Sequence, residues 1–125
     1  MLTGLSRIAA TVLIGSLATN VAVAAGRPTR LGQSTVVDGP RVKPMKVVED
    51  SRCPMNARCV WAGRVVVRTR VSGGRWSRTM DLTLGKPEPV ADGRITLSAV
   101  TPDRVAGGRL DPRRLRFTYE FEGGL

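Results

Sequence analysis

The stretch RVVVRTRVSGGRWSRTMDLTL, residues 64–84, decides the fold. It holds two segments rich in β-branched and alternating residues, 64–71 and 75–84, with Gly73-Gly74 between them. Glycine reaches positive φ without steric cost, so we expect a hairpin turn at this pair. Alternation of apolar and polar residues is typical of a strand with one buried face and one face in water. The stretch therefore predicts a β-hairpin that covers a core.

Four more segments of the chain are predicted to form strands. Short β-branched segments bounded by turn residues occur at 34–38, 41–48, 94–100 and 114–122. Pro44 interrupts the second of them, which makes it an edge strand or a bulged strand. About six to seven strands with frequent turns predict an all-β domain over residues 34–125, a small antiparallel β-sandwich or a partly open barrel.

Most aromatic residues fall on the apolar side of these predicted strands. Period-two alternation places that side against a core. We therefore expect four of the five aromatic side chains to be buried, namely Trp76, Phe117, Tyr119 and Phe121.

Residues 1–25 have the pattern of a secretory signal peptide. Arg7 is followed by a short apolar run over 8–18 and then by the small-residue end NVAVAA. A membrane-spanning helix needs about 20 apolar residues, more than this run offers. We expect an exported protein, periplasmic or secreted, with no transmembrane segment in the mature chain. The polar residues 26–33 then form a flexible leader.

The chain is strongly basic, with 20 lysines and arginines against 10 acids and a net charge of +10. The forked guanidinium group of arginine suits carboxylate and phosphate ligands. A GC-rich genome would also favour arginine codons and so explain the arginine content without a ligand. Three arginines share the face of the 64–71 strand opposite Val65, Val67 and Val71, with Val66 interrupting their row, and a fourth begins the partner strand. These candidate binding residues are Arg64, Arg68, Arg70 and Arg75, with Asp81 the one acid nearby in sequence.

Both cysteines lie in EDSRCPMNARCVWAG, residues 49–63. In an exported protein two cysteines tend to pair, so we expect a Cys53–Cys59 disulfide. An unbroken helix would hold their Cα atoms about 9 Å apart, beyond the roughly 4.4–6.8 Å of a disulfide. The segment must therefore fold back as a stapled loop. We expect Trp61 to pack beside the disulfide.

The string D-S-R-C-P-x4-C-V-W-A-G, residues 50–63, resembles a signature of small exported bacterial proteins of unknown function. The resemblance implies an exported all-β domain. It implies no activity and no functional residues.

Three more specific hypotheses about this loop are a metal site, a redox pair and a partner-binding loop. Structural zinc takes four Cys or His ligands, and this chain has two cysteines and no histidine, so we expect no metal. A redox pair is disfavoured because the spacing is C-x5-C. A rigid loop that presents its side chains to a partner remains open beside a purely structural staple. Its candidates are Met55, Asn56, Arg58 and Trp61.

The absence of histidine removes the commonest general base, and we expect no catalytic residues and no cofactor. Glu120 and Glu122 would lie on the same face of a strand. We interpret them as a solvent-exposed pair rather than as a catalytic pair. The sequence predicts a non-enzymatic binding or envelope-associated domain with an anionic partner: envelope lipid, acidic glycan or acidic protein. Nucleic acid is not expected. The alternative is a protease-inhibitor-like protein that acts through residues 53–59.

Overall fold

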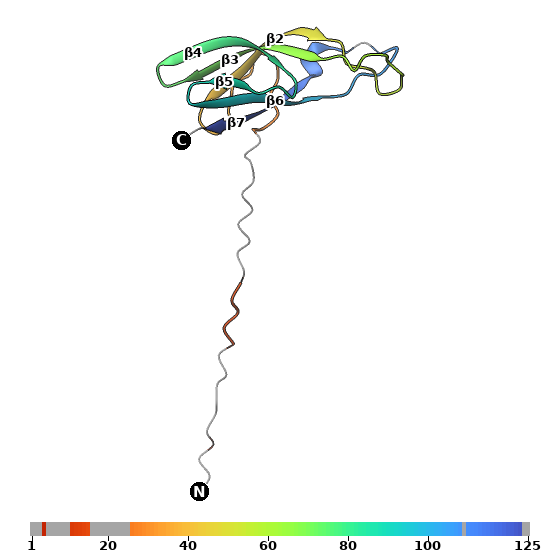
Figure 1. Cartoon of the computed structure of the whole chain (residues 1–125). Coiled ribbons are helices and arrows are strands. Elements are labelled where there is room, and N and C mark those ends of the chain that lie inside the picture. The colour runs from red at the N-terminus through yellow and green to blue at the C-terminus, as the bar shows by residue number, and fades with distance from the viewer. Residues whose placement is uncertain (1–3, 5–10, 16–25, 109, 124–125) are drawn as a thin grey trace.

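The computed structural model describes residue 4 and residues 11–15, 26–108 and 110–123. The described residues form two antiparallel sheets, ordered β1-β2-β3-β4 and β5-β6-β7, which pack face to face (Figure 1). The strands are β1 (Thr35–Val36), β2 (Arg41–Asp50), β3 (Val65–Gly73), β4 (Trp76–Thr83), β5 (Glu88–Val90), β6 (Gly93–Thr101) and β7 (Arg116–Gly123), with a 3-10 helix η1 (Pro112–Arg114) before β7. The predicted all-β sandwich is confirmed. The predicted signal peptide lies outside the described residues, apart from residues 4 and 11–15.

The core forms where the apolar faces of the two sheets meet. Val67 and Val71 of β3 are fully buried, and so are Phe117 and Tyr119 of β7. Alternation along both strands explains this, because every second side chain points to the opposite sheet. Trp76 differs from the prediction, since it is only half-buried at the margin of the core.

One polar link crosses this core. Thr69 is fully buried on the inner face of β3, and its hydroxyl lies 3.0 Å from the hydroxyl of Tyr119. The Thr69 hydroxyl donates to the Val67 carbonyl oxygen at 3.3 Å, so the Tyr119 hydroxyl donates to Thr69. Burial raises the pKa of Tyr119 well above its usual value. The phenol therefore stays neutral and joins the two sheets.

Strand β2 carries the irregularity that Pro44 predicts. Its register against β3 shifts between Pro44 and Lys46 and again between Val47 and Glu49. Each shift inserts one extra residue, which resets the alternation of the strand. The prediction of a bulged strand is confirmed.

Residues 26–33 are part of the domain, so the predicted flexible leader is wrong. Thr29 is 1% exposed and exchanges two backbone hydrogen bonds of 2.8 Å with Phe117. The Gly26 N–H donates to the Tyr119 carbonyl oxygen at 3.0 Å. Polar composition suggested a loose segment, but its backbone groups extend the edge of β7.

The hairpin turn lies one residue beyond its predicted place. Gly73 still pairs with Trp76, so the turn residues are Gly74 and Arg75. Gly74 has a φ of 47°, which glycine adopts without penalty. The Trp76 ring covers Gly73 so closely that an added Cβ would lie 2.9 Å from it.

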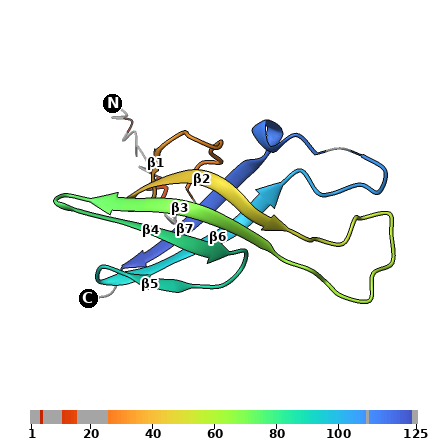
Figure 2. The ribbon, with the colours of Figure 1, turned by 90° about the horizontal axis from the view of Figure 1, so that it is seen from above.

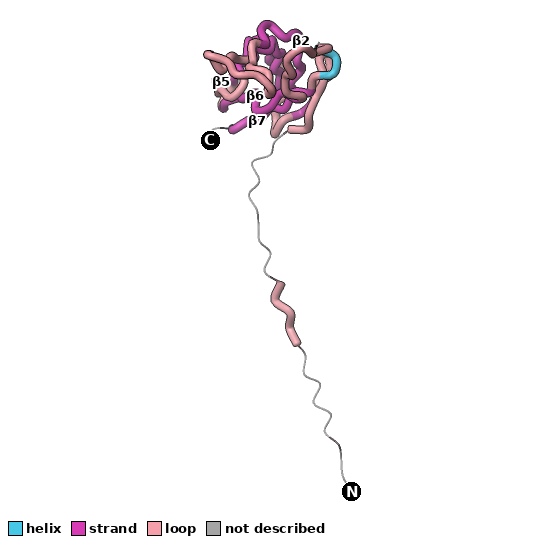
Figure 3. Tube along the Cα trace, turned by 90° about the vertical axis from the view of Figure 1, so that its right-hand side faces the viewer, coloured by secondary structure: helices cyan, strands magenta, loops and turns pink. Residues whose placement is uncertain are grey.

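Two loops project together from one end of the sandwich. One is residues 51–64 between β2 and β3, and the other is residues 102–108 before η1 (Figure 2). We call them the arm. Figure 3 looks onto the end of the arm, with the strands behind it. In the described part of the chain, no helix is long and apolar enough to cross a membrane.

Candidate functional site

The outer face of β2 and β3 brings four cations together. The antiparallel register places Lys43 opposite Arg70 and Lys46 opposite Arg68. Residues directly opposite in such a ladder point to the same side, with Cβ atoms roughly 4.5–5.5 Å apart. Lys46, Arg68 and Arg70 are exposed, and Lys43 is half-buried. We call these four residues the basic face.

Acids compensate this face only in part. The Arg68 Nε lies 3.0 Å from an oxygen of Asp81 on β4. The Arg70 Nε donates to the neutral Ser77 hydroxyl at 2.9 Å. Within the described residues no carboxylate lies within ion-pair distance of Lys43, Lys46 or Arg70. Among the described residues, the two cross-strand pairs of cations therefore have a single acidic partner, Asp81.

The bulge in β2 creates this arrangement. Lys43 and Lys46 are three residues apart, so in a regular strand they would point to opposite faces. The extra residue Met45 resets the alternation and turns both lysines outward. Alternation predicts that the two arginines of β3 share a face, but it does not predict the two lysines, because their spacing contradicts it.

The structure separates the four arginines predicted as binding residues. Arg68 and Arg70 lie together in the basic face. Arg64 precedes β3 and pairs with Glu49, with 2.6 Å between Nε and carboxylate oxygen. Arg75 lies in the β3–β4 turn, at the end of the sandwich away from the arm (Figure 2).

The arm begins as a short ladder that continues β2 and β3. The Ser51 N–H donates to the Arg64 carbonyl oxygen at 2.8 Å, and the Cys53 N–H donates to that of Ala62 at 3.3 Å. The predicted Cys53–Cys59 disulfide is confirmed, with 5.8 Å between the Cα atoms. It closes the loop just beyond the ladder.

Removal of this disulfide is expected to weaken the fold. Cross-linking a loop of seven residues restricts the unfolded chain by about 2 kcal/mol in the chain-entropy account. We expect the Cys53→Ser, Cys59→Ser variant to lose about that much unfolding free energy in urea titrations. Thiol titration of the unfolded, non-reduced parent should find no free thiol, and two titrating thiols would contradict the disulfide.

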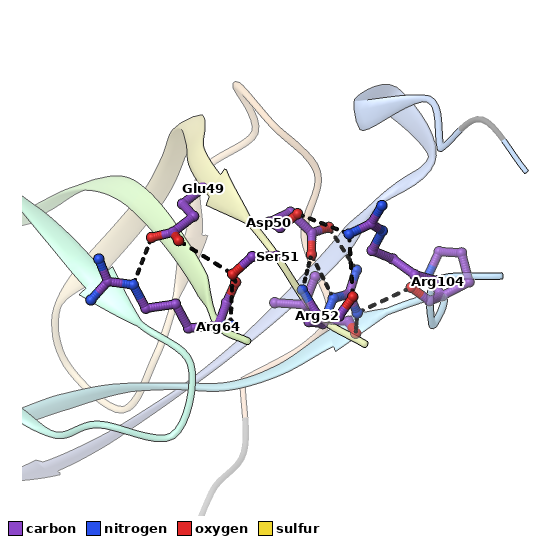
Figure 4. Close-up of polar contacts among 8 residues, drawn as sticks. Glu49, Asp50, Ser51, Arg52, Arg64 and Arg104 are labelled. Atoms are coloured by element: carbon purple, nitrogen blue, oxygen red, sulfur yellow. Dashed lines mark hydrogen bonds and ion pairs between the residues drawn. The ribbon is translucent and has the colours of Figure 1, made fainter. Parts of the chain in front are cut away.

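A cluster of arginines fixes the base of the arm (Figure 4). The Arg52 Nε lies 2.9 Å from an Asp50 oxygen, and these side chains are 13% and 15% exposed. The Arg52 Nη1 also donates to the carbonyl oxygens of Val100 (3.1 Å) and Pro102 (3.3 Å). Arg104 from the other loop donates to the carbonyl oxygens of Asp50 and Arg52, each at 3.2 Å.

The charge of this cluster keeps Asp50 ionised. Burial raises the pKa of the Asp50 carboxyl, but hydrogen bonds and charge from Arg52, with the charge of Arg104, outweigh it and lower the pKa overall. Arg52 and Arg104 also hydrogen-bond to backbone carbonyl oxygens of β2, β6 and both loops. The cluster therefore ties both loops to the sandwich.

Two more hydrogen bonds join the loops further out. The Met55 N–H donates to the Arg104 carbonyl oxygen at 2.8 Å. The Ala106 N–H donates to the side-chain oxygen of Asn56 at 2.7 Å. Asn56, predicted as a contact residue, thus uses its side chain to hold the neighbouring loop.

Four large apolar side chains of the arm are exposed. The exposed fractions are 71% for Met55, 91% for Val60, 82% for Trp61 and 49% for Val105. We call these four residues the tip. Trp61 was predicted to pack beside the disulfide, and its exposure shows that this prediction is wrong.

The loop conformation bears on the inhibitor hypothesis. A substrate-like inhibitor holds its loop extended, but the Ala57 N–H donates to the Pro54 carbonyl oxygen at 3.1 Å and closes a turn. Arg58, the candidate for a trypsin-like pocket, directly follows this turn and is exposed.

The carboxylate pair on β7 does not share a hollow. Glu122 lines one of about 410 Å³ near Arg94, and Glu120 is not part of its lining. Within the described residues, no group of three or more His, Cys, Asp or Glu side chains is placed to hold a metal ion. No protein-family model, curated protein or solved structure matches this chain.

Proposed function

We propose that this chain is an exported, non-enzymatic domain that binds an anionic partner through its basic face. The observation that carries the proposal is the direct opposition of Lys43 to Arg70 and of Lys46 to Arg68. Like charges directly opposite one another destabilise a sheet. An anion laid across the ladder relieves this repulsion and releases the counterions of both partners.

Export is supported by the signal-peptide pattern of residues 1–25 and by the disulfide. Disulfides persist in oxidising compartments and are rare in the reducing cytosol. Anionic lipids, acidic glycans and acidic proteins are the partners available to an exported cationic domain. Phosphate, sulfate and carboxylate groups share the chemistry that lysine and arginine recognise.

The test compares binding of the mature domain to heparin and to anionic vesicles at rising salt. We expect the Lys43→Ser, Lys46→Ser, Arg70→Ser variant to bind at least about tenfold more weakly at low salt. Each exposed ion pair contributes up to about 1 kcal/mol, and 1.4 kcal/mol is a factor of ten. We also expect a shallower dependence of its affinity on salt, because fewer counterions are released.

The matched control removes the same charge elsewhere. Arg27, Arg94 and Arg114 are exposed and lie outside the basic face, and their triple change to Ser should retain most of the binding. Equal weakening of both variants would mean that net charge alone attracts the ligand. Failure of the parent to bind either probe would overturn the proposal.

A further inference from the structure

We propose that the tip of the arm inserts into the interfacial layer of an anionic lipid bilayer. This inference rests on the proposed function, of which it names the partner. Its starting point is the distribution of exposed apolar side chains. Within residues 26–108 and 110–123, seven large apolar side chains are exposed, and the tip holds four of them.

The interactions that fix the arm keep these side chains out of the core. The disulfide, the half-buried Asp50–Arg52 pair and the Arg104 hydrogen bonds fix both loops. They hold the four tip side chains in exposed positions. A preorganised loop also loses little conformational entropy when it binds.

The chemistry of the tip fits a bilayer interface. Trp61 carries a large apolar ring with one N–H donor, the combination enriched at the boundary between lipid chains and headgroups. Val60, beside it, is 91% exposed and offers only apolar surface. Amphipathic segments of peripheral proteins bury their apolar side chains about 5–10 Å into this interface.

Charge complementarity selects anionic lipid. Arg58 is exposed in the same loop as Trp61. Of the acids in and beside the arm, Glu49 pairs with Arg64 and Asp50 with Arg52, whereas Asp103 is exposed and stands against the charge of Arg58. A chain of net charge +10 is drawn to a negative surface, to which each nearby cation contributes attraction.

The test uses vesicles of equal parts phosphatidylcholine and phosphatidylglycerol, some with brominated acyl chains. We expect the parent's tryptophan emission to shift to the blue and to be quenched by the brominated lipid. Trp61→Phe, at an exposed position, should fold normally and lose both effects, because Trp76 lies half-buried at the margin of the core. Quenching that persists in Trp61→Phe would overturn the insertion.

A matched pair of variants tests the apolar contribution while keeping Trp61 as the reporter. Val60→Ser with Val105→Ser changes the tip, and Val36→Ser with Val48→Ser makes the same chemical change at exposed positions of β1 and β2. We expect the tip variant to partition onto the vesicles about tenfold more weakly than the parent, and the control variant to match the parent.

The outcomes separate this inference from the proposed function. Salt-dependent binding to vesicles that is equal in the parent and the tip variant overturns insertion and keeps the basic face. Binding to heparin without binding to vesicles also overturns insertion and keeps an anionic partner. Binding to neither probe overturns both proposals.

Discussion

Replacing Tyr119 by alanine is expected to lower the free energy of unfolding by about 3–5 kcal/mol, the range for aromatic truncation in a core. The ring is fully buried between the sheets. Its loss leaves a cavity, and the buried Thr69 hydroxyl loses its donor. Urea unfolding followed by circular dichroism measures the change, with an unaltered m-value as evidence that the transition remains two-state.

Tyr119→Phe is the matched control for this variant. It keeps the ring and removes only the hydroxyl, while the Thr69 hydroxyl still donates to Val67. We expect a loss of about 1–2 kcal/mol, the range for an unmade buried hydrogen bond. Equal losses in the two variants would mean that the polar link, and not the packing of the ring, supplies the stability.

The second large effect is expected at Gly63, where alanine should destabilise the arm by about 2 kcal/mol or more. Gly63 has a φ of 70°, and a Cβ added there would overlap the Ser51 carbonyl group. A left-handed backbone alone costs a residue with a side chain about 1–2 kcal/mol. The overlap adds displacement of the ladder strand that carries Ser51.

Gly107→Ala, on the other loop of the arm, separates these two causes. Its φ is 81°, but the space around its added Cβ is empty. We expect about 1 kcal/mol from the backbone conformation alone. Hydrogen exchange of the Cys53 amide reports the arm directly, because this N–H donates to Ala62. Equal protection of that amide in both alanine variants would contradict the overlap.

The sequence predicted those parts of the fold that depend on local alternation. The apolar faces of β4 and β7 follow from period-two patterns, so Leu82, Phe117 and Phe121 lie where the pattern places them. The buried Thr69–Tyr119 link was not predicted, because its partners are fifty positions apart in the chain. Alternation predicts the face of the strand on which a residue lies, but not which residues of the opposite sheet it contacts.

Only part of the candidate site could be predicted, because alternation finds residues that share a face within one regular strand. Arg68 and Arg70 share a face within one strand, and alternation finds them. Lys46 joins them only because a bulge reverses its direction, which no regular pattern anticipates. Trp61 was misplaced because large aromatics are usually buried, whereas the arm is held by Arg52 and Arg104 and leaves the ring exposed.

The strand order described above has a consequence for folding kinetics. Each sheet is built from strands that follow one another along the chain, so every ladder within it pairs strands joined by at most 14 residues. Closing such a connection costs less chain entropy than joining distant segments. The Thr29–Phe117 bridge is the exception, because it joins the two ends of the domain. The entropic cost of closure is therefore largest for this pairing, and we expect it to form after both sheets.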